Sequence, residues 1–250
     1  MSRIPLALAA ALLAPLTAGC AGGPDRAAGA PPPAIRLTAT LDSPVDITLR
    51  WVDRGPPPAG HVVEFATAPR GPYTVLGFLP PDQASYAHRK LMPHTPFYYR
   101  VRPFYGPASP QVDVTLPPGG FDEDSPSDAD WARPRTVPPA APVTTAPVRA
   151  GGAAAPTDLR PTVMDPNGIL FTWTDHASDE QGYLLEVRAA GRPDWAAVAV
   201  FDPGVNAAGL VTLPDEKRAS YRVRAFSYGA ASKVAHRTTG SDQSDNAGDS

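Results

Sequence analysis

The sequence contains a single cysteine, Cys20, in 250 residues, and one cysteine cannot form an intramolecular disulfide. It has no basic surplus either, because 22 Lys and Arg stand against 25 Asp and Glu. The chain therefore offers no electrostatic reason to bind nucleic acid, and we expect no nucleic-acid partner. Long apolar runs are also missing. The run from Ile4 to Leu16 has 13 residues, whereas a membrane-spanning helix needs about 20.

The motifs of catalysis and metal binding are missing too. There is no Gly-x-Ser-x-Gly elbow, no His-Glu-x-x-His and no phosphate-binding Gly-x-x-x-x-Gly-Lys. The five histidines are dispersed, so no zinc site can be assembled from closely spaced ligands. The acidic run 122–130 lacks the glycine of a calcium loop and contains Pro126. We therefore predict that the protein is not an enzyme and has no catalytic residue, metal or cofactor.

The N-terminus has the pattern of a secretory signal: Arg3, then the short apolar run, then small residues before Cys20. We predict a signal peptide over 1–19 and a Gly, Ala and Pro-rich tether over 20–33. The sequence Leu-Thr-Ala-Gly-Cys at 16–20 resembles the bacterial lipobox, although its leucine lies one position further from the cysteine than is usual. The resemblance implies lipid attachment at Cys20, a membrane partner and a lipoprotein of the bacterial cell envelope that faces the periplasm or exterior. The alternative is an ordinary signal peptide with an incidental cysteine.

One pattern then occurs twice at a constant offset of 122 residues, as Trp51 and Trp173 or Tyr99 and Tyr221 illustrate. Both copies contain short segments in which apolar and polar residues alternate, separated by Pro and Gly-rich turns, and neither has a helical period. A repeat unit of this length indicates tandem domains, each with its own core. We predict antiparallel β-sandwiches over 34–116 and 155–238.

The early tryptophan strand, the Gly-x-x-x-Glu segment and the late Tyr-Arg-Val-Arg strand of each copy resemble bacterial fibronectin type III domains. The resemblance implies an all-β fold with two immunoglobulin-like sandwiches. It also implies that acids such as Asp175, Asp179 and Glu180 hold a turn, although such a cluster could also serve acid/base chemistry. The paired arginines of the late strand are expected to face water rather than form an anion site. The structural signature residues are Trp51, Asp53, Tyr99, Trp173, Asp175, Glu180, Gly182 and Tyr221.

Residues 117–154, between the copies, are rich in Pro, Ala and acid and predict a disordered, partly extended linker. The tail over 239–250 is predicted to be disordered as well. We expect the two domains to fold independently, at a variable separation set by the linker. Trp131 is unusual in such a linker. It either docks on a domain or provides a contact for a partner.

These features predict a non-catalytic, lipid-anchored envelope protein whose two modules serve in protein binding or spacing. The alternative is an adhesin or carbohydrate-binding accessory protein, for which Tyr73, Tyr86, Tyr98 and Tyr105 could form a row of exposed rings. The partner would be another envelope protein or a surface polysaccharide. The sequence leaves the oligomeric state open.

Overall fold

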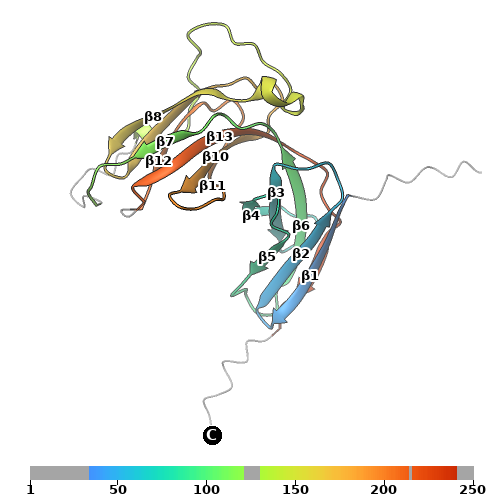
Figure 1. The fold of residues 1–250 in the computed structure, drawn as a ribbon. Coiled ribbons are helices and arrows are strands. Elements are labelled where there is room, and N and C mark those ends of the chain that lie inside the picture. Colours follow the sequence, from blue (N-terminus) through green and yellow to red (C-terminus); the bar gives the residue numbers. More distant parts are fainter. Residues whose placement is uncertain (1–33, 121–129, 214–215, 241–250) are drawn as a thin grey trace, which may run out of the picture. The chain divides into compact units, whose positions relative to one another are not determined.

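The computed structural model describes residues 34–120, 130–213 and 216–240. These residues form antiparallel sheets and two short 3₁₀ segments, which confirms the predicted all-β class (Figure 1). The elements are β1 (Ile35–Ser43), β2 (Asp46–Asp53), β3 (Gly60–Ala66), β4 (Thr74–Leu79), β5 (Ser85–His88), β6 (Pro96–Tyr105), β7 (Val112–Thr115), η1 (Asp130–Ala132), η2 (Val148–Ala154), β8 (Thr157–Asp165), β9 (Gly168–Thr174), β10 (Gly182–Ala189), β11 (Ala196–Phe201), β12 (Ala207–Val211), β13 (Arg218–Tyr228) and β14 (Ala235–Thr238).

The first sandwich places the sheet β1-β2-β5 against a sheet formed by β4, β3, β6 and β14. Alternation along β2 directs Ile47, Leu49 and Trp51 into the core, where each is at most 4% exposed. The second sandwich repeats this plan with β12-β9-β8 against β11, β10, β13 and β7. Here Phe171 and Trp173 of β9 enter the core in the same way. A three-stranded sheet facing a four-stranded one is an immunoglobulin-like arrangement.

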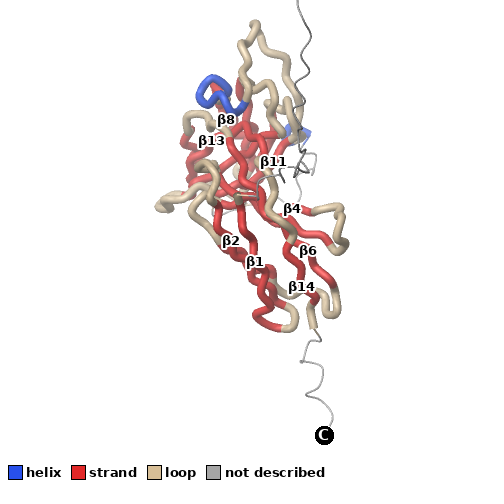
Figure 2. Tube along the Cα trace, turned by 90° about the vertical axis from the view of Figure 1, so that its right-hand side faces the viewer, coloured by secondary structure: helices blue, strands red, loops and turns tan. Residues whose placement is uncertain are grey.

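Each sandwich takes its last strand from the other copy. The strand β7, which follows the first sandwich, pairs antiparallel with β13 of the second (Figure 1). The strand β14, which follows the second sandwich, pairs antiparallel with β6 of the first (Figure 2). The two crossings are equivalent in detail. The hydroxyl of Ser109 accepts a hydrogen bond from the Val223 amide at 3.1 Å, and the hydroxyl of Ser232 accepts one from the Val101 amide at 3.1 Å. The two copies thus exchange their terminal strands within one chain.

The sequence between β6 and β7 favours a chain that crosses to the second sandwich and does not fold back onto the first. Pro107 and Pro110 restrict it to extended backbone and cannot donate to a ladder. Gly106 has a φ of +144°, and a Cβ there would lie 2.0 Å from the carbonyl oxygen of Ala225 and 2.9 Å from Cγ1 of Val148. The crossing chain therefore lies so close to β13 and η2 that only glycine fits.

The ends of β6 and β13 meet where the chains cross. Tyr105 pairs with Ser227, and Phe104 packs edge-on against Phe226 with 6.2 Å between ring centroids. The guanidinium of Arg149, from η2, lies 3.6 Å from the ring centroid of Tyr105. The pairing of β6 with β13 joins the two sandwiches through one continuous eight-stranded sheet, and Phe104, Leu184 and Phe226 form a small apolar cluster at this junction.

The predicted disordered linker is wrong for residues 130–154. Val148 and Ala154 are buried in the core of the second sandwich, because η2 lies against β13. Arg135 forms a backbone bridge with Ala207. The same residues form the long tan loop and the blue helical segment at the top of Figure 2. Residues 121–129 lie outside the described part of the chain.

Two related expectations also need correction. Variable separation of the domains is incompatible with the exchange, because moving the sandwiches apart would break the pairing of both β7 and β14.

The order at the C-terminus extends beyond β14, although disorder was predicted from residue 239 onward. The Thr239 amide donates to the Thr95 carbonyl at 3.1 Å, and the Gly240 amide to that of Pro44 at 2.8 Å. Residues 241–250 lie outside the description.

The exchange makes a prediction about Leu116, which the sequence assigns to the first copy. Its side chain is 5% exposed in the core of the second sandwich, and its amide donates to the Lys217 carbonyl at 2.8 Å. Leu116→Ala should lower the free energy of unfolding by about 2–5 kcal/mol. Hydrogen exchange should quicken in β13 rather than in β6. Leu41→Ala, at a position 39% exposed in β1, serves as the control. Loss of protection confined to β6 would rule out the exchange.

Candidate functional site at the junction of the two sandwiches

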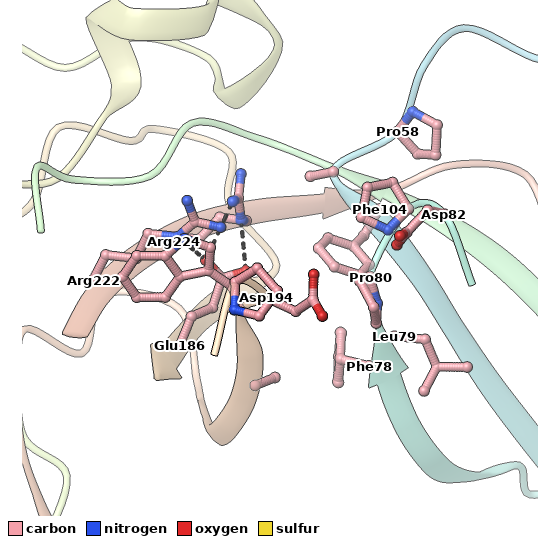
Figure 3. Close-up of a pocket in the computed structure, with 15 residues that line it drawn as sticks. Pro58, Phe78, Leu79, Pro80, Asp82, Phe104, Glu186, Asp194, Arg222 and Arg224 are labelled. Carbon is pink, nitrogen blue, oxygen red and sulfur yellow. Dashed lines mark hydrogen bonds and ion pairs between the residues drawn. The ribbon is translucent and has the colours of Figure 1, made fainter. Parts of the chain in front are cut away.

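A pocket of about 440 Å³ lies where the two sandwiches meet (Figure 3). Apolar residues of the first sandwich form one wall, among them Phe78, Leu79 and Phe104. Residues of β10 and β13, together with the turn before β11, form the other wall. This second wall contains Glu186, Asp194, Trp195, Arg222 and Arg224. The pocket depends on the exchange, which holds the two walls together.

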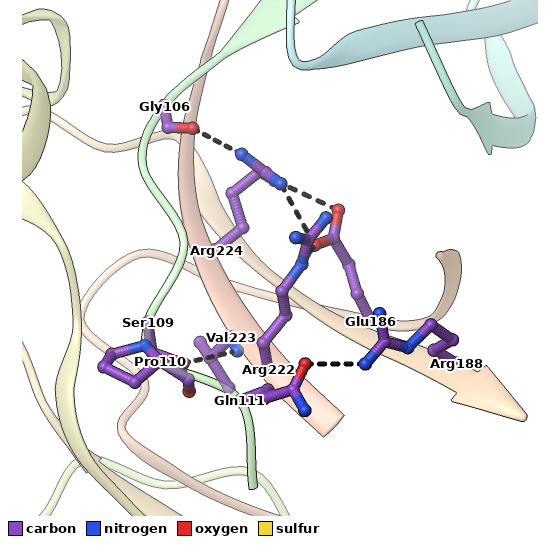
Figure 4. A network of polar contacts seen from close by, with 9 residues as sticks. All are labelled: Gly106, Ser109, Pro110, Gln111, Glu186, Arg188, Arg222, Val223 and Arg224. Carbon is purple, nitrogen blue, oxygen red and sulfur yellow. Dashed lines mark hydrogen bonds and ion pairs between the residues drawn. The ribbon is translucent and has the colours of Figure 1, made fainter. Parts of the chain in front are cut away.

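Glu186 is the centre of the polar wall, and the register of β10 against β13 places it opposite Arg222. Its side chain is 8% exposed. Arg222 donates from Nε at 2.5 Å and Arg224 from Nε at 3.0 Å, so two guanidinium groups share one carboxylate. Arg224 also donates to the carbonyl of Gly106 at 2.6 Å and so ties the network to the crossing chain (Figure 4). A buried carboxylate held by two arginines is a fixed structural charge rather than a free acid.

Trp195 covers this network. Its ring centroid lies 4.2 Å from Cζ of Arg222 and 4.9 Å from Cζ of Arg188, both within cation–π range. Burial lowers the pKa of Arg222, although the attraction of Glu186 opposes that shift. Among the described residues, Arg222 donates only from Nε, and Figure 3 shows its side chain at the pocket. The terminal nitrogens of Arg222 are therefore donors that a ligand in the pocket could use.

The first sandwich contains the same stack. Glu64 accepts from Arg100 at 2.6 Å, and the guanidinium of Arg100 lies 4.0 Å from the ring centroid of Tyr73. The hydrogen bond to Glu64 raises the pKa of Arg100. Arg102 lies over the ring of Tyr228 instead of sharing the carboxylate. The expectation that the paired arginines simply face water is wrong, because a buried glutamate pairs with Arg100 in the first copy and with both Arg222 and Arg224 in the second.

The aromatic signature residues are core residues. Trp51 and Trp173 are 4% and 5% exposed, in the first and second core respectively. Tyr99 is fully buried, and its hydroxyl lies 3.1 Å from Nδ1 of His88. Burial raises the pKa of Tyr221 to about 12. These side chains pack the cores of the two sandwiches.

The acidic signature residues bind neighbouring donors. Asp53 lies 3.1 Å from Nε2 of His61, and Asp175 accepts a hydrogen bond from the hydroxyl of Tyr183, which occupies the equivalent position. Asp175 also accepts from the Ala177 amide at 2.8 Å.

Two further acids of this loop accept hydrogen bonds from backbone amides that are distant in the sequence. Glu180 accepts from the Gly204 amide at 3.0 Å, and Asp179 accepts from the Val148 amide at 2.6 Å. The contact of Asp179 fixes the start of η2.

Gly182 is required for close approach of two chains. Its φ is +149°, and a Cβ there would lie 2.4 Å from the carbonyl oxygen of Phe201. Gly60, the equivalent residue, would place a Cβ 2.3 Å from the carbonyl oxygen of Leu79. The glycine of the Gly-x-x-x-Glu segment thus lets the neighbouring edge strand pass.

Trp131 packs on the outside of the second sandwich. A Cβ on Gly209 would lie 2.5 Å from Cζ3 of Trp131, and one on Gly168 would lie 2.7 Å from its Cζ2. The ring therefore occupies the space that these two glycines leave on β9 and β12. The sequence left two roles open for Trp131, docking on a domain or contact with a partner. The described contacts are those of docking on the second sandwich.

The four tyrosines considered for a carbohydrate surface do not form a row. Each has its ring covered by another group. The covering groups are Arg100 over Tyr73, His236 on Tyr98, Arg149 over Tyr105 and the first core around Tyr86.

The described residues contain neither a candidate metal site nor a candidate membrane span. Over residues 34–120, 130–213 and 216–240, no group of three or more His, Cys, Asp or Glu could hold a metal ion. Within the same ranges, no helix is long and apolar enough to cross a membrane. The predicted signal peptide, Cys20 and the tether before residue 34 lie outside the described residues.

Sequence reasoning missed the Glu64 and Glu186 networks, although a signal was present. In both copies a glutamate precedes the first of two alternating arginines by 36 residues, and apolar neighbours surround both segments. It also missed the exchange. The crossing segment has two prolines where a returning hairpin would need a tight turn.

Comparisons with known proteins concern the fold alone. A two-domain fibronectin type III segment from chicken tenascin is 13% identical, with 82% of this chain and 98% of that chain covered and a TM-score of 0.26. The FN1–FN3 domains of chicken CNTN1 are 18% identical, with 85% and 68% covered and a TM-score of 0.26. The central fibronectin type III array of RIM-binding protein is 13% identical, with 79% and 60% covered and the same TM-score. No protein-family model and no curated protein matches the sequence.

The carboxylate of Glu186 is shared by two arginines, and its role can be tested with the equivalent Glu64 of the first copy as the control. Glu186→Gln leaves both Arg222 and Arg224 without an anionic partner, so the free energy of unfolding should fall by about 3–5 kcal/mol. Glu64→Gln removes the partner of one arginine and should cost less. Urea denaturation of the two variants measures the difference. Equal losses would show that the second arginine adds nothing.

Proposed function

We propose that this protein is a non-catalytic, lipid-anchored protein of the bacterial cell envelope that binds another envelope protein at the junction pocket. The single observation behind the binding role is that the strand exchange holds two sandwiches as one body, with a pocket formed by both. Spacing alone would not need such a junction. A sandwich framework positions loops and strand edges for binding, which is compatible with this role.

The pocket favours an extended segment that carries one apolar side chain and one carboxylate. The rings of Phe78 and Phe104 provide an apolar wall, and the terminal nitrogens of Arg222 can bind a carboxylate in a bidentate manner. Asp82 and Asp194 are exposed residues of the lining and would repel a strongly acidic segment. The preferred partner thus has a single acid beside an apolar residue.

A photo-crosslinking experiment tests the binding role. A photoreactive amino acid at Asp194, which is exposed and lines the pocket, should form an adduct with an envelope protein in the native host. The crosslinked segment, identified by mass spectrometry, should carry a carboxylate next to an apolar residue. The same group at Arg36, exposed on β1, is the control. Equal labelling from both positions, or no adduct from Asp194, would contradict the proposal.

The membrane anchor has a test of its own. The proposal rests on the sole cysteine following the apolar core of a signal, where acyl chains each contribute about 0.8 kcal/mol per buried methylene. Cys20→Ser should move the protein from the membrane fraction to the soluble fraction of a native-like host. Ala18→Ser, which leaves the cysteine in place, is the control. A Cys20→Ser protein that still sediments with membranes would refute acylation.

A further inference from the structure

The chain between η1 and η2 forms a strap, residues 136–147, that is fixed at both ends. At its start, the side chain of Asn206 accepts from the Val137 amide at 2.6 Å and donates to the Val137 carbonyl at 2.8 Å. At its end, the Thr144 carbonyl lies 2.9 Å from Nδ1 of His176, and the Ala146 amide donates to the His176 carbonyl at 2.9 Å. Within the described chain, residues 138–143 form no hydrogen bond to the sandwich. The strap is the yellow-green loop at the top of Figure 1.

A pocket of about 640 Å³ lies between the strap and the second sandwich, within the range of about 300–1,000 Å³ that small-ligand sites occupy. The strap contributes an apolar wall, formed mainly by Val137, Pro138, Pro139 and Val143. Strands β8 and β9, with the residue directly after β9, contribute a polar wall. Its residues are Asp158, Arg160, Thr172, Trp173, Thr174 and Asp175.

Several groups of the polar wall have unused hydrogen-bonding capacity among the described residues. Asp158 accepts only at Oδ2, and Asp175 only at Oδ1, so each has one free oxygen. The Arg160 guanidinium and the Thr172 hydroxyl have no partner there, and the Trp173 indole N–H is buried without an acceptor. Acceptors and donors therefore occur together in one pocket.

The first sandwich shows which part of this site is specific to the second. Trp51 also lines a pocket and also has a buried indole N–H without an acceptor among the described residues, so that feature belongs to the repeat. However, Ala84 stands where Asn206 holds the strap, and no strap covers Trp51 within the described part of the chain. The strap and its polar wall are additions to the second copy.

We propose that the strap pocket binds a neutral saccharide. A sugar ring offers hydroxyl groups that donate and accept at once, which matches free carboxylate oxygens beside a guanidinium and a hydroxyl. The C–H face of the ring matches the proline and valine wall. The two acids and one arginine of the wall give a net charge of −1, which disfavours phosphate or carboxylate ligands. This site is separate from the junction pocket and does not depend on the protein-binding role.

The test is a binding titration of residues 21–250 by calorimetry and ligand-observed NMR. The neutral probes are glucose, galactose, mannose, N-acetylglucosamine, maltose and cellobiose. Glucuronic acid and choline are the charged probes. At least one neutral probe should bind saturably, and glucuronic acid should bind more weakly than glucose. The proposal is overturned if no neutral probe binds or if a charged probe binds most tightly.

Three variants link any binding to the strap pocket. Arg160→Ala removes an exposed side chain of the wall and should weaken binding about tenfold, the loss of one charged hydrogen bond. Asn206→Ala gives the second copy the residue of the first and should also weaken binding, by releasing the strap. Arg50→Ala, exposed on β2, is the matched control and should bind as the parent does. Circular dichroism confirms folding. Binding unchanged in Arg160→Ala and Asn206→Ala overturns the proposed site.

Discussion

A β-sandwich needs a partner for the open edge of its late strand, because unpaired backbone amides and carbonyls are costly at a buried edge. In this chain, the partner of β6 is β14 and the partner of β13 is β7, so neither copy completes its own sheet. The rest of the arrangement depends on this exchange. It sets the path of the crossing segments, requires glycine at residue 106 and brings Phe104 against Phe226.

The exchange also explains why the polar network at Glu186 can be buried. The crossing chain carries the Gly106 carbonyl to Arg224, and Trp195 closes the other side over Arg222. Because it accepts hydrogen bonds from two guanidinium groups, the Glu186 carboxylate can be desolvated without the full penalty of an isolated charge. The apolar wall of the first sandwich then faces a polar wall in which two arginines share one carboxylate, and the space between them is the junction pocket.

The two copies share a framework and differ in what surrounds it. Glu64 and Glu186 each lie opposite the first arginine of the late strand, because the register between strands is the same. Gly60 and Gly182 each allow the neighbouring edge strand to approach closely. Asn206 instead of Ala84 has a larger effect than its single position suggests. It holds the strap over the outer side of the second sandwich, whereas no strap covers the pocket beside Trp51 in the described residues of the first.

The sequence alone determined the all-β class, the two copies and their core, since alternation along a strand sets the face on which Trp51 or Trp173 lies. It could not determine which sandwich receives β7 or β14, because both late strands offer the same Tyr-Arg-Val-Arg edge and local patterning is identical for closed and exchanged pairing. The sequence also predicted disorder for residues 130–154, because a Pro and Ala-rich composition has no apolar periodicity that would indicate a strand or helix. Only the tertiary structure supplies the distant partners, Asp179 for Val148 and Asn206 for Val137, that order this segment. The junction pocket and the strap pocket both arise from such contacts between distant residues.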